Sequence, residues 1–166
     1  VRENLPHPEV RTNVSDHAYL RPSEWIADCL ANGLLDSNTE PEYESLSQSS
    51  LAKKLQVVDQ LNGARSIFLS LWCNDFDPND NKNNRGSVWT MTLTVETETS
   101  GATNINHVYP IAVGPKGSNH YEVMEIIWED ILSLQRGESV EMYNGFTHRV
   151  EKVSCHVIAC TMDQPE

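Results

Sequence analysis

The stretch that decides the fold is Leu71–Trp89, LWCNDFDPNDNKNNRGSVW. An apolar run ends in it at Trp72, and Asn74, Asp75 and Asp77 follow almost at once. A short, nearly continuous apolar run is typical of a strand that is covered on both faces. We therefore expect a buried strand that ends directly in a group of oxygen-bearing side chains.

Three interpretations of this group remain open on residue types alone. The Asn and Asp side chains could form a plain turn by bonding to their own backbone. They could form a calcium-binding loop with Asp75, Asp77 and Asn79 as ligands. However, the glycine and glutamate that an EF-hand needs at its sixth and twelfth positions are replaced here by Asp80 and Gly86. They could also supply the first carboxylate of a metal-dependent active site.

From Ser66 onward, strand patterns surround one helix pattern. Short apolar or alternating runs bounded by turn residues predict strands, and a period of 3.6 residues predicts a helix. Pro110, within the third run, indicates an edge position or a bulge. In order, the predicted elements are strands over 66–73, 87–98 and 106–117, a helix over 120–137 and a strand over 148–165.

The helix over 120–137 has the strongest pattern in the chain. Asn119 is placed to cap it, and Gly137 is placed to end it. Its apolar residues fall on one face, which we expect to pack on the sheet. They are Val123, Ile127, Ile131 and Leu134, with Met124 and Trp128 widening the face.

Two shorter helices are predicted before the first of these strands. The first covers residues 22–33, with Ser23 as its cap and Gly33 at its end. The second covers residues 49–63, and its apolar stripe is also expected to pack on the sheet. This stripe consists of Leu51, Leu55, Val58 and Leu61.

The order strand, strand, strand, helix, strand predicts an α/β fold with a ribonuclease H-like mixed sheet. Three antiparallel strands are followed there by a crossover helix and by a strand parallel to the first. Because such crossovers are right-handed, the ends of the two parallel strands lie side by side. Asp75 and Asp163 would then be neighbours. We assign residues 65–166 to this core, which we expect to be truncated at its C-terminus, and residues 1–64 to a helical and irregular extension.

Two neighbouring carboxylates indicate a particular chemistry. They repel each other unless a cation lies between them. Mg²⁺ and Mn²⁺ prefer oxygen ligands, and Mg²⁺ is commonly held by one or two carboxylates together with phosphate and water. Such ions activate a hydroxyl and stabilise the leaving oxygen in phosphodiester chemistry. We therefore predict a catalytic pair, Asp75 and Asp163, with Asn74 and Asp77 as further metal ligands.

The net charge of −12 restricts the partners of the chain. Surfaces that bind nucleic acids are usually basic, so DNA contact here would need metal ions, a local patch or other parts of a longer protein. The stretch 82–85 and Lys116 are the basic elements that could approach a phosphate. Trp72, Trp89 and four reduced cysteines are expected in the core, and no membrane-spanning stretch is present.

Three segments resemble, in the same order, the catalytic core of CACTA-type transposases of plants and animals. Their pattern is Leu-Trp-x-Asp-Asp-Phe-x-Pro-Asn, then Gly-Pro-Lys after the third strand, then Asp-x-Pro-Glu-Arg. The matching segments are LSLWCNDFDPNDNKNNRGSVWTMTLTV (69–95), YPIAVGPKGSNHYEVMEII (109–127) and IACTMDQPE (158–166).

This resemblance implies a DDE enzyme that uses divalent metal to cut and join DNA. Asp163 matches the second catalytic aspartate of the pattern. The leading aspartate of Asp-Asp-Phe falls on Asn74, a neutral amide and a poorer ligand, and the second falls on Asp75. The third acid is implied to lie on a helix beyond Glu166.

Two functions follow as expectations. The first is a fragment of a transposase-derived, nuclear DNA nuclease and strand-transfer domain, inactive alone, that meets DNA through a longer parent protein. The second is a domesticated, inactive module whose acidic surface contacts a basic protein. Whether the chain is an enzyme stays open, and a homo-oligomer is compatible with both.

Overall fold

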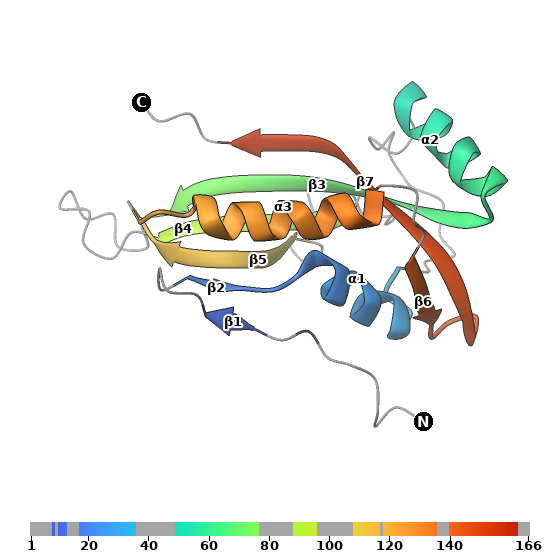
Figure 1. Ribbon diagram of the computed structural model, residues 1–166, viewed down its shortest axis with the longest axis horizontal. Helices are drawn as coiled ribbons and strands as arrows, with labels where there is room; N and C mark the ends of the chain where they lie inside the picture. The colour runs from blue at the N-terminus through green and yellow to red at the C-terminus, as the bar shows by residue number, and fades with distance from the viewer. Residues whose placement is uncertain are drawn as a thin grey trace.

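The computed structural model describes residues 8, 10–12, 17–35, 49–76, 88–95, 108–116, 118–135 and 140–162. Within these residues the chain has an α/β fold of three helices and one mixed sheet (Figure 1). The helices are Pro22–Ala31 (α1), Ser50–Leu61 (α2) and Tyr121–Gln135 (α3). The strands are Arg11–Thr12 (β1), Ala18–Tyr19 (β2), Ala64–Phe76 (β3), Val88–Val95 (β4), Val108–Pro115 (β5), Val140–Asn144 (β6) and Arg149–Met162 (β7).

The sheet has the strand order β1-β2-β5-β4-β3-β7-β6. Its centre is an antiparallel meander of β3, β4 and β5, after which α3 and β6 lead into β7. β7 lies beside β3 and runs parallel to it. The predicted succession of three antiparallel strands, a helix and a strand parallel to the first is therefore confirmed.

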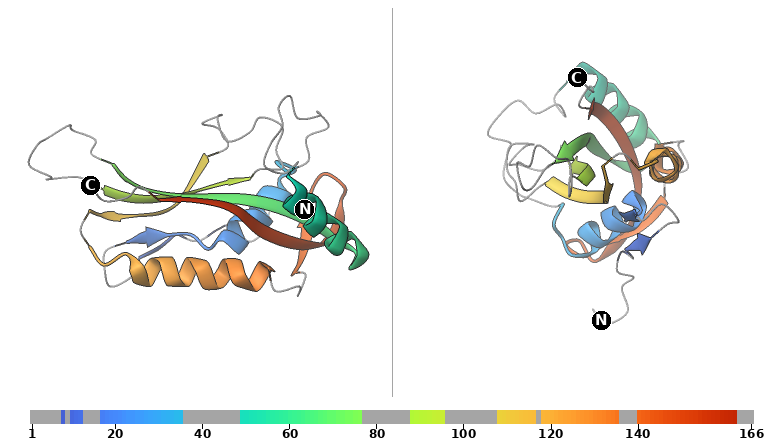
Figure 2. Two further views of the ribbon diagram at one scale, coloured as in Figure 1. Left: turned by 90° about the horizontal axis from the view of Figure 1, so that it is seen from above. Right: turned by 90° about the vertical axis from the view of Figure 1, so that its left-hand side faces the viewer.

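One face of the sheet, here called the helix face, is covered by α1 and α3 (Figure 2). Alternate residues of each strand point to this face, as the pleat of a strand requires. On β3 these are Ile67, Leu69, Leu71 and Cys73, all buried in one core with residues of both helices. Because α1 contributes Trp25, Ile26, Cys29 and Leu30 to that core, it packs with the sheet as one hydrophobic unit.

α3 lies within the predicted range 120–137 and has the predicted buried face, while Gly137, which was expected to end it, lies outside the described residues. The side chain of Asn119 accepts a hydrogen bond from the backbone N–H of Tyr121 at 3.3 Å, which satisfies one donor of the first turn. The expected stripe is buried almost completely, and it consists of Val123, Ile127, Ile131 and Leu134.

The expected cap of α1 is wrong. The helix begins after Arg21, and Ser23 lies inside its first turn. The Ser23 backbone N–H and hydroxyl instead donate to the Asp130 carboxylate of α3, at 2.7 and 2.8 Å. Gly33 follows the helix with φ of 71°, a conformation that favours glycine, so the predicted end of the helix is confirmed.

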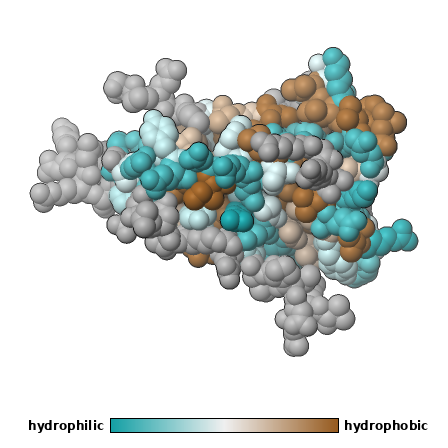
Figure 3. Space-filling view, viewed as in Figure 1, coloured by the Kyte–Doolittle hydropathy of each residue, from teal (hydrophilic) through white to brown (hydrophobic). Residues whose placement is uncertain are grey.

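The expectation that the apolar stripe of α2 packs on the sheet is also wrong. Of the residues of α2, all of which are described, only Ala52 and Asp59 are buried. Leu51, Val57, Val58 and Leu61 are more than half exposed, and apolar surface gathers over this helix at the upper right of Figure 3. α2 therefore attaches to β3 by a small residue and a carboxylate.

Three short strands were not expected from the sequence: β1, β2 and β6. β6 forms a hairpin with the first residues of β7, from Val140 opposite Val153 to Asn144 opposite Arg149. Gly145 in its turn lies against the end of α1, where a Cβ atom would come within 1.8 Å of the Ala31 carbonyl oxygen. The hairpin thus closes one end of the core.

Two irregularities shape the sheet. Leu69 lies opposite Val157 and Ser70 opposite Ala159, so Ile158 is an extra residue in β7. Pro110 lies next to a similar register shift in β5, which confirms the bulge predicted there. Bulges of this kind bend a strand and re-aim its side chains. None of the helices among the described residues is long and apolar enough to cross a membrane.

Candidate functional site

The site predicted from the sequence lies where β3 and β7 end together. The parallel register places Cys73 opposite Met162. Asn74 and Asp75 follow Cys73 within β3, and Asp163 follows Met162 in the sequence. Asp163 itself lies outside the described residues, as do Asp77 and the stretch 78–87, which includes the proposed calcium ligand Asn79 and the basic stretch 82–85.

Asn74 and Asp75 are both exposed, but they belong to opposite faces of the sheet. Side chains alternate along a strand, and Cys73 points into the core of the helix face. Asp75 therefore shares the helix face with Cys73, while Asn74 lies on the other face. The Asn74 carbonyl oxygen accepts a hydrogen bond from the Thr90 hydroxyl of β4 at 3.2 Å, which fixes the backbone here.

Asp75 is paired with Lys116, at the end of β5. The ammonium group of Lys116 lies 3.3 Å from Oδ2 of Asp75, and both side chains are about two-fifths exposed (40% and 43%). Lys116 was expected to be a solvated lysine or a phosphate contact. The structure instead places its charge beside the candidate ligand, where it attracts the carboxylate through solvent-screened electrostatics.

An aromatic and imidazole cluster adjoins Asp75 and was missed by sequence reasoning. Trp89 lies opposite Asp75 in β4 and is buried, whereas Trp72, also expected in the core, is 48% exposed. The His120 ring stacks on Trp89 with centroids 4.7 Å apart, and the His17 ring meets its edge at 5.9 Å.

His17 is held in this cluster by a glycine contact. A Cβ atom on Gly114 would come within 2.0 Å of the His17 ring. The Nε2 atom of His17 is also 3.0 Å from the hydroxyl of Ser118. The feature of the sequence that could have indicated this contact is the glycine of Gly-Pro-Lys, because a residue without a side chain permits such a close approach. Its partner could not be found because His17 is distant in sequence.

The fit of these residues to a metal ion is incomplete within the described part of the chain. No group of three or more His, Cys, Asp or Glu side chains there could hold one. Asp75 supplies one carboxylate, and its near neighbour is a cation. The other two predicted carboxylates, Asp77 and Asp163, are not among the described residues.

The four cysteines are free thiols, as expected, but only three are buried. Burial, followed by the nearby Cys160, raises the pKa of Cys73 to about 11. Burial, followed by the charges of Asp59 and Asp130, raises the pKa of Cys155 to about 12. Cys160 is exposed, which corrects the expectation that all four lie in the core. The buried thiols are therefore poor nucleophiles.

A second polar cluster joins α2 to the sheet. One carboxylate oxygen of Asp59 lies 2.7 Å from Nε2 of His156 in β7 and accepts a hydrogen bond from the Ser66 hydroxyl of β3. Both contacts go to the same oxygen of a buried Asp59. Asp59 thus joins α2 to both β3 and β7, and the cluster anchors this helix to the sheet.

Comparison with known proteins adds no relative. No family model matches the sequence, and no curated protein matches it. The likeness to transposase cores therefore depends on the three quoted motifs.

Proposed function

We propose that the chain is the front part of a ribonuclease H-like core from a transposase-derived, metal-dependent DNA nuclease that acts in the nucleus. The observation that carries this proposal is the parallel register of β3 and β7, with Cys73 opposite Met162. It supports the proposal because Met162, which precedes Asp163 in the sequence, lies beside Cys73, which precedes Asn74 and Asp75. Strand tips that meet in this way are a rigid support for groups that must act together.

In this proposal Asp75 and Asp163, with Asp77, would hold Mg²⁺ or Mn²⁺, whereas Asn74 lies on the other face of the sheet from Asp75. When bound, such ions supply charge stabilisation for phosphodiester cleavage. Asp75 is positioned by the ladder between β3 and β4, in which it lies opposite Trp89. Lys116 holds its carboxylate until a stronger cation competes for it. DNA contact would come through a longer parent protein, because this chain carries a net charge of −12.

Paramagnetic Mn²⁺ titration, followed by NMR of the amide groups, tests the proposal. The expected result is selective broadening at the ends of β3 and β7, around Asp75 and Asp163. Asp75→Asn and Asp163→Asn should each remove it, while the exposed carboxylate of Glu141 in β6 provides the control Glu141→Gln. Broadening that spreads over the acidic surface, or that survives both aspartate changes, would disprove the site.

A second candidate is a domesticated, inactive module that contacts a basic protein. The ion pair between Asp75 and Lys116 favours it, because the candidate ligand already has a cationic partner. The neutral Asn74 at the leading position of the motif points the same way. Binding to histones and to duplex DNA, compared at moderate salt, separates the candidates. Tight binding to DNA without metal would exclude this one.

A further inference from the structure

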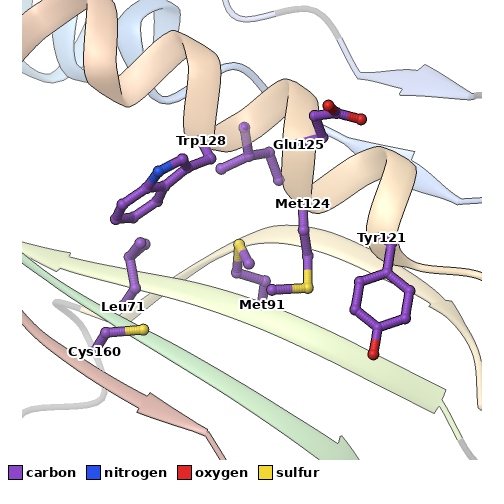
Figure 4. A pocket seen from close by; sticks show the side chains of 8 residues that line it. Leu71, Met91, Tyr121, Met124, Glu125, Trp128 and Cys160 are labelled. Carbon is purple, nitrogen blue, oxygen red and sulfur yellow. The ribbon is translucent and has the colours of Figure 1, made fainter.

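An apolar groove lies between α3 and the strands β3, β4 and β7 (Figure 4). It encloses about 470 Å³. Figure 4 shows the Trp128 indole and the Met124 side chain reaching from α3 toward Leu71, Met91 and Cys160 on the strands. Trp128 remains 43% exposed and Cys160 is also exposed, so α3 does not close the groove on the side of β7.

The groove adjoins a strand edge that is open within the described residues. β6 pairs with β7 only from Arg149 to Val153, so the outer edge of Ser154–Met162 has no described strand beside it. Its sequence, SCHVIACTM, has no Lys, Arg, Asp, Glu or Pro. Proteins usually protect exposed edges with such residues because unpaired N–H and C=O groups recruit other strands. The bulge at Ile158 interrupts this edge, but the stretches on either side of it, Ser154–Val157 and Ala159–Met162, have no such protection and could pair with another segment.

One of the residues that line the groove is acidic. This residue is Glu125, and Glu129 is exposed one turn further along α3. The chain as a whole carries a net charge of −12. An approaching segment with basic residues would therefore be attracted, and an acidic one would be repelled.

We propose that this edge and groove together bind an extended segment of a partner protein as an added strand on β7. Apolar side chains at alternate positions would enter the groove beneath Trp128, and flanking Lys or Arg residues would be attracted by Glu125 and by the net charge of the chain. Strand addition takes its affinity from backbone hydrogen bonds and its specificity from pockets for alternate side chains. The inference does not need nuclease activity, and it gives the second candidate function a defined site.

The geometry of a sheet supports this arrangement. A strand added to β7 would lie about 4.8 Å from it, and a layer packed on a sheet lies about 10 Å above it. The side chains of the added strand that point to the helix face would therefore enter the space beside Cys160 and below Trp128. The other side chains would face away from the groove, so only alternate positions are selected.

Fluorescence anisotropy with a synthetic peptide tests the proposal. The probe alternates Val, Ile and Leu with Thr, carries two lysines at each end, and is labelled with fluorescein. Two N-methylated versions block the odd or the even backbone N–H groups. Because only one edge of the peptide faces β7, one version should lose binding and the other should keep it. Equal binding of both versions would overturn strand addition.

A pair of tryptophan variants tests the groove. Trp128→Ala should weaken binding about tenfold, as expected for a central aromatic contact. Trp72→Ala is the matched control, because Trp72 is similarly exposed (48%) but lies on the face away from α3. The same loss in both variants, or in neither, would contradict the site. Replacing the terminal lysines with glutamates should weaken binding further, and unchanged affinity would refute the basic partner.

A second copy of this chain is the competing occupant. Sedimentation of the protein alone would then show a dimer that Trp128→Ala dissociates, and this result would overturn the proposal of a basic partner. Failure of the Mn²⁺ titration leaves this proposal intact. The titration reports on Asp75 and Asp163, whereas peptide binding depends on Trp128 and the edge of β7.

Discussion

The Asp130 carboxylate of α3 caps the first turn of α1 by accepting two hydrogen bonds from Ser23. One comes from the backbone N–H and one from the hydroxyl, so each carboxylate oxygen has a donor. A helix leaves its first N–H groups without intrahelical partners, and a carboxylate from a neighbouring helix serves as well as a local cap. The two helices over the sheet are thus joined by a charged contact.

Asp130→Ala should lower the free energy of unfolding by about 2 kcal/mol, because it removes two hydrogen bonds to a charged acceptor. Urea denaturation measures this loss. Ser23→Ala should cost less, since the backbone N–H can still donate. Glu129→Ala, at an exposed neighbouring position, should change stability little. Equal effects of Asp130→Ala and Glu129→Ala would contradict the capping role.

Asp59→Ala should release α2 from the sheet while leaving the rest of the fold in place. Asp59 makes the polar contacts to Ser66 and His156, and Ala52 is the other buried side chain of the helix. Hydrogen exchange of the α2 amides should become much faster, with little change in α3. Gln56→Ala, at an exposed position of the same helix, is the control. Unchanged exchange in α2 would show that the cluster does not anchor it.

Lys116→Gln should increase the affinity of the Asp75 site for Mn²⁺ about two- to fivefold, the range expected when an exposed ion pair no longer competes. The reason is the ammonium group 3.3 Å from the carboxylate. The Mn²⁺ titration by NMR measures it. Lys152→Gln, at an exposed position of β7, removes the same charge at a different position. If both variants gain equally, the effect is general attraction rather than local competition.

One thiol of the folded protein should react rapidly with Ellman's reagent at pH 8. Cys160 is exposed, whereas the pKa of Cys73 and that of Cys155 are raised to about 11 and about 12, chiefly by burial. Cys29 is buried as well. Cys160→Ser should remove the fast phase, and denaturant should expose the other thiols. A fast phase that persists in this variant would contradict the burial of the core cysteines.

Glu151 should contribute a small, pH-dependent part of the stability. Burial alone would raise its pKa, but hydrogen bonds from Asn144 and Thr147 and the charge of Arg65 together lower it from 4.5. The contribution is therefore present above the unfolded pKa and is lost as the pH falls through the lowered folded pKa. It should stay below about 1 kcal/mol, because solvent screens the group.

Denaturation of Glu151→Gln between pH 6 and pH 3 measures this contribution. The variant should show a shallower loss of stability with falling pH than the unchanged chain. Parallel curves would mean that the carboxylate contributes nothing that depends on its charge.

The helices show what an apolar pattern can and cannot predict. In α3, Val123 and Ile127 belong to a stripe long enough to determine which face is buried. The apolar stripe of α2 looked similar, yet its Leu61 is 82% exposed. The side of α2 that packs on the sheet is the one that carries Ala52 and Asp59. Periodicity gives the face of a helix that is apolar, but it does not show that the sheet has room for it.

The position of the site could be predicted only where the order of the elements along the chain determines which strands are neighbours in the sheet. The parallel pairing of β3 and β7 follows from right-handed crossover, and it was expected. The contact of His17 with Gly114 depends on β2 adding to β5, and a two-residue strand has almost no pattern to detect. The partner of Asp75 was missed for a related reason, since Lys116 reaches it across β4 from the end of β5.

The extra residue Ile158 changes which positions of β7 face α3. Before it, the side chains facing α3 are at odd positions such as Cys155; after it they are at even positions such as Cys160. Deleting this single residue would remove the bulge and restore regular alternation, with Cys160 still opposite Leu71 and Thr161 still opposite Trp72. A one-residue deletion at this point of β7 would therefore leave the side chains that face the groove in place, because Ile158 is not one of them.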